Sequence, residues 1–108
     1  MGYRVVFTPE AQEQLVALFD YIACAASANI AANYTDAIVN YCESLAMFPR
    51  RGTCRDDVRP GLRITHYRKR TVIAFAVTDD QVAILGIYYG GQDYEAMLQA
   101  EEDVWPKS

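Results

Sequence analysis

Basic side chains are concentrated in one segment of this sequence, between positions 50 and 70. Eight of the ten lysines and arginines fall there against two aspartates, Asp56 and Asp57, so the segment carries a formal charge of +6 and the remaining residues carry −10. Such segregated charge favours a face that docks an anionic partner, either a protein or a nucleic acid. The alternative is a solvated loop and hairpin whose arginine stems pack on their neighbours. The eight residues are Arg50, Arg51, Arg55, Arg59, Arg63, Arg68, Lys69 and Arg70.

Other residue types that could do chemistry are sparse. His66 is the only histidine, and a single histidine is more often structural than catalytic. Cys24, Cys42 and Cys54 form no CxxC pair, no zinc-ligand spacing and no even disulfide framework, so we expect reduced thiols and no metal site. The overall pI of about 4.8 argues against broad binding to nucleic acids, because affinity for a phosphate backbone grows with the number of cationic contacts.

The composition describes one compact domain. With 108 residues, of which 52% are apolar, the chain can build one hydrophobic core, and we expect a single domain over residues 1–108. No apolar run approaches the ~18 residues that a membrane span needs, and residues 1–4 lead into a strand pattern instead of a signal peptide. The sequence therefore predicts a cytoplasmic protein without membrane association.

The first half of the chain predicts a strand and two amphipathic helices. β-Branched and aromatic residues from Tyr3 to Phe7 form the strand, and Thr8 and Pro9 then serve as N-cap and first residue of a helix. A break at residues 25–29 separates this helix from a second, which Pro49 ends. Two such helices joined by a few residues must lie antiparallel as a hairpin. The expected buried stripes are Ala11, Leu15, Leu18, Phe19, Ile22 and Ala26, and then Ile30, Tyr34, Ala37, Ile38, Tyr41, Leu45 and Phe48.

The second half predicts an antiparallel meander. After an arginine-rich connection at residues 50–61, strands are expected at 62–67, 71–78 and 81–89, with turns at 68–70 and at Asp79–Asp80. Near-continuous apolar runs mark the last two as central strands of a four-stranded sheet, with the helical hairpin over at least one face. Asp93 is a candidate N-cap for a short C-terminal helix or tail. The predicted fold class is α+β, in the order β-α-α-β-β-β.

Six short motifs occur in a characteristic order along nearly the whole chain. They are RVVFTPEA at 4–11, LFDYIA at 18–23, LAMFPR at 45–50, GLR at 61–63, TDDQVAIL at 78–85 and YGGQD at 89–93. In their order and spacing the sequence resembles the ParE branch of the RelE/ParE superfamily, the toxins of bacterial type II toxin–antitoxin (plasmid stabilisation) modules. The resemblance implies a non-enzymatic toxin that inhibits DNA gyrase, needs no cofactor and is held inactive by a ParD-like antitoxin.

Members of the RelE branch cleave ribosome-bound mRNA, which leaves an enzymatic alternative. The superfamily often carries an arginine in its last strand where this sequence has Gly86, and often a histidine where it has Tyr89. A tyrosine of ordinary pKa ~10 is a poor base at neutral pH. Arg63, Arg68 and Arg70 still supply positive charge, so the ribonuclease alternative stays open, as does a module that binds its antitoxin without a toxic target.

Two sets of residues are expected to bind partners, and none is expected to be catalytic or to read DNA sequence directly. Exposed arginine and tyrosine side chains anchor protein interfaces, and the set expected to bind the gyrase target consists of Arg63, Arg68, Lys69, Arg70, Tyr88 and Tyr89. The resemblance implies that an antitoxin helix lies in a groove between the helical hairpin and the sheet. The corresponding antitoxin set is Leu15, Leu18, Phe19, Ile22, Tyr34, Tyr41, Arg50 and Arg51, although each apolar member could instead be core.

Overall fold

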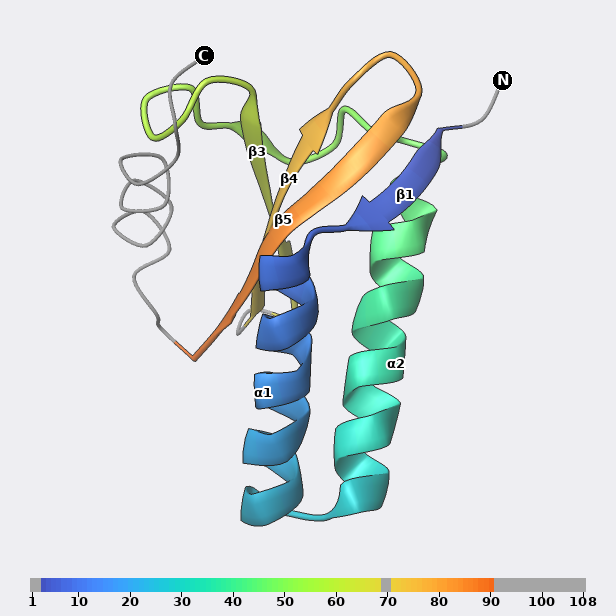
Figure 1. Ribbon diagram of the computed structural model, residues 1–108, viewed down its shortest axis with the longest axis vertical. Helices are drawn as coiled ribbons and strands as arrows, with labels where there is room; N and C mark the ends of the chain where they lie inside the picture. Colours follow the sequence, from blue (N-terminus) through green and yellow to red (C-terminus); the bar gives the residue numbers. More distant parts are fainter. Residues whose placement is uncertain (1–2, 69–70, 91–108) are drawn as a thin grey trace.

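The computed structural model describes residues 3–68 and 71–90 of the chain. Figure 1 shows two antiparallel helices lying side by side against a twisted sheet. Along the chain the elements are β1 (Arg4–Phe7), α1 (Pro9–Ala25), α2 (Ala28–Ser44), β2 (Thr53–Cys54), β3 (Leu62–Tyr67), β4 (Thr71–Val77) and β5 (Gln81–Tyr89). The α+β class and the order of the main elements are therefore as the sequence predicts. The expected C-terminal helix lies outside the described residues.

Within the described residues, the sheet has five strands in the order β1-β5-β4-β3-β2 and is mixed. Strands β2 to β5 pair antiparallel, which confirms the meander, whereas β1 pairs parallel with β5 from Arg4 opposite Gln81 to Phe7 opposite Ile84. Two parallel neighbours cannot be joined by a tight turn, and here the helical hairpin and the meander connect them. The expectation of four strands is wrong by one, because Thr53 and Cys54 in the arginine-rich connection add the short edge strand β2.

Side-chain caps start both helices where the sequence indicates. Thr8 Oγ1 accepts a hydrogen bond from the Ala11 N–H (3.2 Å), and Ser27 Oγ accepts one from the Ile30 N–H (3.1 Å). Each bond satisfies an N–H that has no partner inside its helix. Among the described residues, no helix is both long and apolar enough to cross a membrane.

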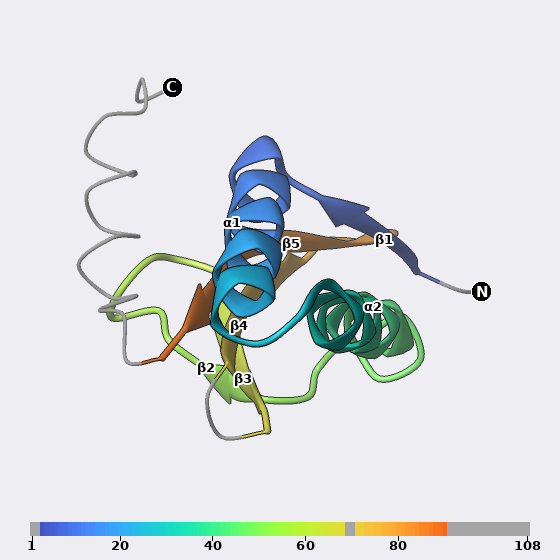
Figure 2. The same ribbon diagram turned by 90° about the horizontal axis from the view of Figure 1, so that it is seen from below.

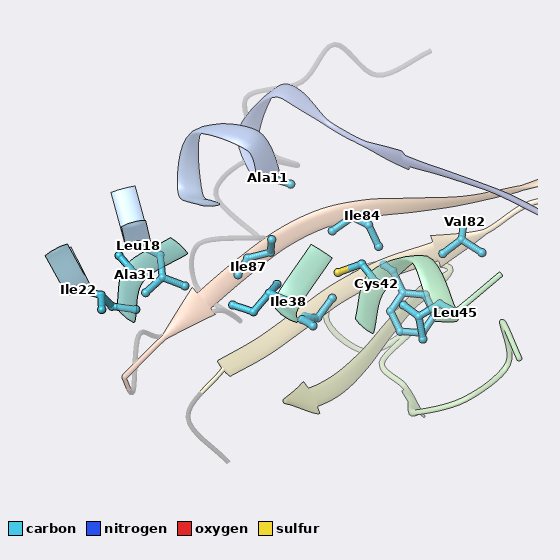
Figure 3. Close-up of a cluster of buried hydrophobic side chains, with 12 residues drawn as sticks. Ala11, Leu18, Ile22, Ala31, Ile38, Cys42, Leu45, Val82, Ile84 and Ile87 are labelled. Carbon is cyan, nitrogen blue, oxygen red and sulfur yellow. The ribbon is translucent and has the colours of Figure 1, made fainter. Parts of the chain in front are cut away.

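The main hydrophobic core lies between the two helices and one face of the sheet (Figure 3). Figure 2 views the helices nearly end-on and shows them next to each other along the sheet. A smaller cluster on the opposite face contains Val58, Leu62, Ile64, Ala74 and Tyr88. The buried members of the main core are Ala11, Leu18, Ile22, Ala31, Ile38, Cys42, Leu45, Ile73, Phe75, Val82, Ile84 and Ile87.

Helix α2 differs from its predicted form in its end and its buried stripe. It ends at Ser44, and the next turn tightens to bonds three residues apart, such as Met47 N–H to Ser44 O (3.1 Å). Ile30 and Phe48 were expected in the core but are 53% and 62% exposed. The buried residues of the helix are Ala31, Thr35, Ile38 and Cys42. Three of these are small, which lets the α2 backbone approach its neighbours closely.

A β-bulge in β5 decides which side chains of this strand face the helices. Phe75 lies opposite Ile84 and Ala74 lies opposite Gly86, so Leu85 is the extra residue. The extra residue reverses the alternation of side chains along the strand. As a result Ile84 and Ile87 both belong to the core under the helices, while Tyr88 belongs to the cluster on the opposite face.

A pair of isoleucines in α2 tests this assignment of the core. We expect Ile38→Ala to lower the free energy of unfolding by about 2–5 kcal/mol, because Ile38 is fully buried and the truncation leaves a cavity. Ile30→Ala, the same change at a position 53% exposed, should alter it by less than about 0.5 kcal/mol. Urea unfolding of both variants measures the difference, and equal losses would contradict the placement of α2.

The buried thiol of Cys42 predicts a pH dependence. Burial, with a smaller contribution from the nearby Glu43 carboxylate, raises the pKa of Cys42 to about 12 from a usual 9.0. Above about pH 9 the unfolded chain loses this proton and the folded chain keeps it, so folding becomes less favourable by up to about 1.4 kcal/mol per pH unit. We expect the difference in free energy of unfolding between wild type and Cys42→Ala to change by up to about 1.4 kcal/mol for each pH unit between pH 9 and about pH 11. A difference that stays constant in urea unfolding across this range would contradict burial of the thiol.

Candidate partner-binding surface

A row of three paired residues crosses the sheet at the end where β3 and β5 stop and β4 begins. Tyr67, Thr71 and Tyr89 lie directly opposite one another on the three strands. The Tyr34 ring from α2 makes edge contacts with the Tyr67 and Tyr89 rings, at centroid distances of 5.9 and 6.0 Å. Because Thr71 is small, there is room for Tyr34 between the two larger side chains.

Two hydrogen bonds fix α2 over this row. One joins Tyr34 Oη and Thr71 Oγ1 (2.7 Å), and the other joins Tyr41 Oη and Thr65 Oγ1 (3.0 Å). Both threonines are buried, so these hydroxyl pairs satisfy polar atoms that would be expensive to leave without a partner. The two tyrosines are seven residues apart and therefore lie on one face of the helix. Their hydrogen bonds set the position of α2 along the sheet.

Ring contacts extend the row in both directions into a continuous strip. Tyr67 packs against Tyr41 (5.3 Å between centroids), and Tyr89 packs against the exposed Tyr21 of α1 (5.9 Å). The Arg68 guanidinium lies over Tyr67, and that of Arg51 lies over both Tyr41 and Phe48. We call this surface the aromatic strip; it consists of Phe48, Arg51, Tyr41, Tyr67, Arg68, Tyr34, Tyr89 and Tyr21.

A pocket of about 440 Å³ opens at the Tyr21 end of the aromatic strip. Strand β1 ends at Phe7, opposite Ile84, so the last residues of β5 have no described strand on that side. At Ile87 the side chain of Gln14 from α1 replaces a strand partner, since its Oε1 accepts a hydrogen bond from the Ile87 N–H (2.7 Å). The result is a partly apolar hollow beside a strand edge, and its lining residues are Gln14, Ala17, Leu18, Tyr21, Ile87, Tyr89 and Gly90.

The basic segment is divided between arginines that hold loops and arginines that face outward. Arg63 Nε and Nη2 donate to the backbone oxygens of Arg51 and Arg50, and its Nη1 donates to Cys54 Sγ (3.0 Å). Arg55 makes a bidentate pair with Asp57, in which both nitrogen–oxygen distances are 3.0 Å. This hydrogen bond holds the pKa of Asp57 below its usual range. These contacts fix the connection that runs into β3.

The two carboxylates of the basic segment are both engaged locally. Asp57 faces Arg55, and Asp56 Oδ1 accepts a hydrogen bond from the Gly61 N–H (2.8 Å). Neither is paired with Arg51 or Arg68, and among the described residues Arg55–Asp57 is the one ion pair that meets a 4.0 Å limit. Within residues 3–68 and 71–90, Arg51 and Arg68 of the aromatic strip therefore have no carboxylate partner.

The structure divides the expected target set. Arg68 is exposed and Tyr89 is half-buried in the aromatic strip, whereas Arg63 uses its guanidinium to hold the 50–54 backbone. Tyr88 is only 1% exposed, so the expectation that its side chain is presented to a partner is wrong. The bulge at Leu85 and the alternation of β5 place it under the far-face cluster. Lys69 and Arg70 lie outside the described residues.

The expected antitoxin set is also divided. Leu18 and Ile22 are buried in the core, and Leu15 and Phe19 pack against it, so these four side chains mainly stabilise the hairpin. Tyr34, Tyr41 and Arg51 belong to the aromatic strip, and Arg50 is exposed beside it. Three further residues complete the strip: Phe48, which was expected in the core, and Tyr67 and Tyr21, which belong to neither expected partner-binding set.

Position 86 has no room for a side chain while the Tyr88 ring keeps its present place. A Cβ at Gly86 would lie 2.6 Å from Cζ and Cε2 of the Tyr88 ring, well inside van der Waals contact. The glycine and the buried tyrosine are thus a matched pair that fills this part of the far face. Within residues 3–68 and 71–90, no group of three histidine, cysteine or acidic side chains is placed to hold a metal ion.

The anchoring role of Arg63 can be tested with a conservative change. Arg63→Lys keeps the charge but removes the fork that holds two backbone oxygens, so we expect it to lower the free energy of unfolding by about 1–2 kcal/mol. Amide exchange within residues 50–54 should accelerate more than exchange in β4. Arg50→Lys is the matched control, because no described residue accepts a hydrogen bond from the exposed Arg50 side chain. Unchanged exchange in the Arg63 variant would contradict the anchoring role.

Comparison with known proteins agrees with this architecture. A family profile described as "ParE toxin of type II toxin-antitoxin system, parDE" matches residues 5–94. A chain of the chromosomal ParDE toxin–antitoxin system from P. aeruginosa is 21% identical, with a TM-score of 0.72 over 82% of this chain and 96% of that chain. A chain of the toxin–antitoxin complex RelBE2 from Mycobacterium tuberculosis is 19% identical, with a TM-score of 0.59 over 82% of this chain and 99% of that one.

At these identities the two structures show a shared fold, and the profile carries the assignment. No curated protein matches the chain in sequence. The matched residues run from β1 through the whole of the sheet and include every residue of the aromatic strip. The chain therefore belongs to the ParE toxin family of type II toxin–antitoxin systems.

Proposed function

We propose that this toxin inhibits DNA gyrase by binding to it, and that a ParD-like antitoxin neutralises the toxin. The observation that carries the proposal is the aromatic strip, in which arginine and tyrosine side chains form one continuous surface at the end of the sheet. Arginine and tyrosine are the residue types that most often dominate the energy of protein interfaces. Family membership supplies the type of system, and the strip supplies a surface suited to protein partners.

The hydrogen bonding of the strip supports binding over catalysis. Cleavage of RNA needs one group to take the 2′-hydroxyl proton and cations placed around the phosphate. Here the hydroxyls of Tyr34 and Tyr41 are bonded to buried threonines, and Arg63 is directed at backbone oxygens. Gly86 has no side chain to place beside a phosphate, and a Cβ there would meet the Tyr88 ring. These residues hold the fold, which leaves Arg51 and Arg68 as surface contacts.

The structural neighbours support an antitoxin partner. One belongs to a ParDE system and the other to a RelBE2 toxin–antitoxin complex. The cations of the strip would attract an acidic segment of such a partner, which raises the rate of association and its specificity more than its affinity. The same charge suits an acidic region of the target enzyme.

A supercoiling assay with purified gyrase tests the proposed target. We expect the toxin to reduce supercoiling and to cause linear DNA to accumulate, and we expect the antitoxin to reverse both effects. Arg68→Ala should weaken inhibition by about tenfold, because it removes an exposed cation from the strip. Ile30→Ala changes an exposed side chain outside the strip and is the matched control.

Unaffected gyrase, with a toxin shown to be folded by circular dichroism, would contradict the proposed target. Discrete cuts in translated mRNA after induction of the toxin, detected by primer extension, would instead establish the ribonuclease alternative. Normal growth on expression without antitoxin would contradict toxicity itself.

A further inference from the structure

The Arg51 guanidinium lies over two aromatic rings. Its Cζ lies 5.5 Å from the centre of the Tyr41 ring and 5.7 Å from that of Phe48. A guanidinium that lies over aromatic rings is attracted to their faces, and its N–H groups project from the edge of its plane. The two rings thus restrict the orientation of Arg51 while leaving its edge available for hydrogen bonds.

The backbone beneath Arg51 is held as well. Arg63 Nε donates to Arg51 O (3.2 Å), Arg63 Nη2 donates to Arg50 O, and the Arg51 N–H donates to Phe48 O (3.3 Å). A binding group that is already fixed loses little conformational entropy when a partner arrives. Arg51 is therefore preorganised through both its backbone and its side chain.

The donors of Arg51 remain available within the part of the chain that the structure describes. No described oxygen accepts a hydrogen bond from its guanidinium, and the two carboxylates of the basic segment, Asp56 and Asp57, are bonded to Gly61 and Arg55. The half-buried site raises the value of a charged hydrogen bond compared with one in open water. A planar arginine fork matches the two oxygens of a carboxylate.

The Phe48 ring adjoins this fork, and Met47 precedes Phe48 in the chain. Met47 is 76% exposed and Phe48 is 62% exposed, although both are large apolar side chains. A carboxylate bound at Arg51 would have an apolar patch beside it, which suits a protein segment with alternating acidic and apolar residues. A nucleic acid backbone would match the cation but would leave Met47 uncovered, so the arrangement favours a protein partner.

We propose that Arg51, held between Tyr41 and Phe48, is a receptor for a carboxylate of the antitoxin, and that Met47 and Phe48 receive an apolar side chain close to that carboxylate. The inference rests on the proposed antitoxin partner and goes beyond it by naming the anchor and the chemistry it recognises. Because recognition depends on the fork and on its stacking, a lysine cannot replace Arg51, although it carries the same charge.

The test measures binding of the toxin to a purified ParD-like antitoxin. We expect Arg51→Lys to weaken binding by about tenfold or more, nearly as much as Arg51→Ala, and Phe48→Ala to weaken it by about fivefold. Arg55→Lys is the matched control: the same substitution in the same segment, at an arginine that pairs with Asp57, should leave the affinity unchanged. Thermal melts establish that each variant is folded.

A double-mutant cycle identifies the carboxylate. Replacing each acidic residue of the antitoxin by its amide should reveal one position whose loss of affinity disappears in the Arg51→Ala background. Wild-type affinity in Arg51→Lys would overturn the inference, since charge alone would then suffice, and an equal loss in Arg55→Lys would overturn it too. The inference would also be overturned if Arg51→Ala abolished binding of the toxin to duplex DNA and left its affinity for the antitoxin unchanged. If the wild-type toxin fails to bind this antitoxin, the proposed partner is wrong and the inference falls with it; wild-type binding with unaffected Arg51 variants overturns the inference alone.

Discussion

Thr8 joins the N-terminal strand, the first helix and the last strand through a small set of hydrogen bonds. Its N–H and Oγ1 both donate to Ile84 O (3.1 and 3.0 Å), while Oγ1 also accepts from the Ala11 N–H. The junction lies where β1 ends its parallel pairing with β5. The Thr8–Ile84 contact closes a loop between residues 76 positions apart, which is entropically unfavourable. Burial of β5 between its strand neighbours and under the helical core offsets that cost. Once β1 is paired with β5, α1 must start against β5, and α2 is brought over the remaining strands.

The placement of α2 in turn creates the aromatic strip. The pairs Tyr34–Thr71 and Tyr41–Thr65 set the helix against the ends of β3 and β4. The same tyrosine rings carry the contacts with Tyr67 and Tyr89 that continue across the sheet. The strip is therefore structural on its inner side and a binding surface on its outer side. Mutations of Tyr34 or Tyr41 would mix a loss of stability with a loss of binding, whereas Phe48, Arg51 and Arg68 lie at its margin and separate the two effects.

Charge in the basic segment serves two physical purposes. Arg55 and Arg63 donate to a carboxylate and to backbone oxygens within the loop, so their charge is directed inward. Arg51 and Arg68 lie over aromatic rings and have no described carboxylate as a partner. The formal charge of +6 thus overstates the charge offered to a partner, because part of it is directed inward. Arg51 and Arg68 are distinguished from Arg55 and Arg63 by their position over tyrosine rings, since all four carry the same charge.

Local sequence determined the element types, most of their boundaries and the family. The cap at Thr8, the break before Ser27, the two apolar runs of β4 and β5 and the ordered motifs each act over a few residues, so periodicity and capping chemistry suffice to identify them. The basic segment was also apparent as a linear feature. Which of its arginines face outward was not apparent, because this depends on backbone oxygens and rings that come from other elements.

Tertiary structure alone decided the parallel pairing of β1, the bulge at Leu85 and the membership of the aromatic strip. A one-residue bulge reverses which side chains face the helices, which is why Tyr88 is buried on the far face when its sequence neighbour Tyr89 reaches the strip. The buried face of α2 consists of Ala31, Thr35, Ile38 and Cys42 and leaves Ile30 exposed, and Phe48 lies beyond the end of the helix at Ser44. Packing between elements distant in sequence, which no local pattern encodes, brought Phe48, Arg51, Tyr41 and Tyr67 together.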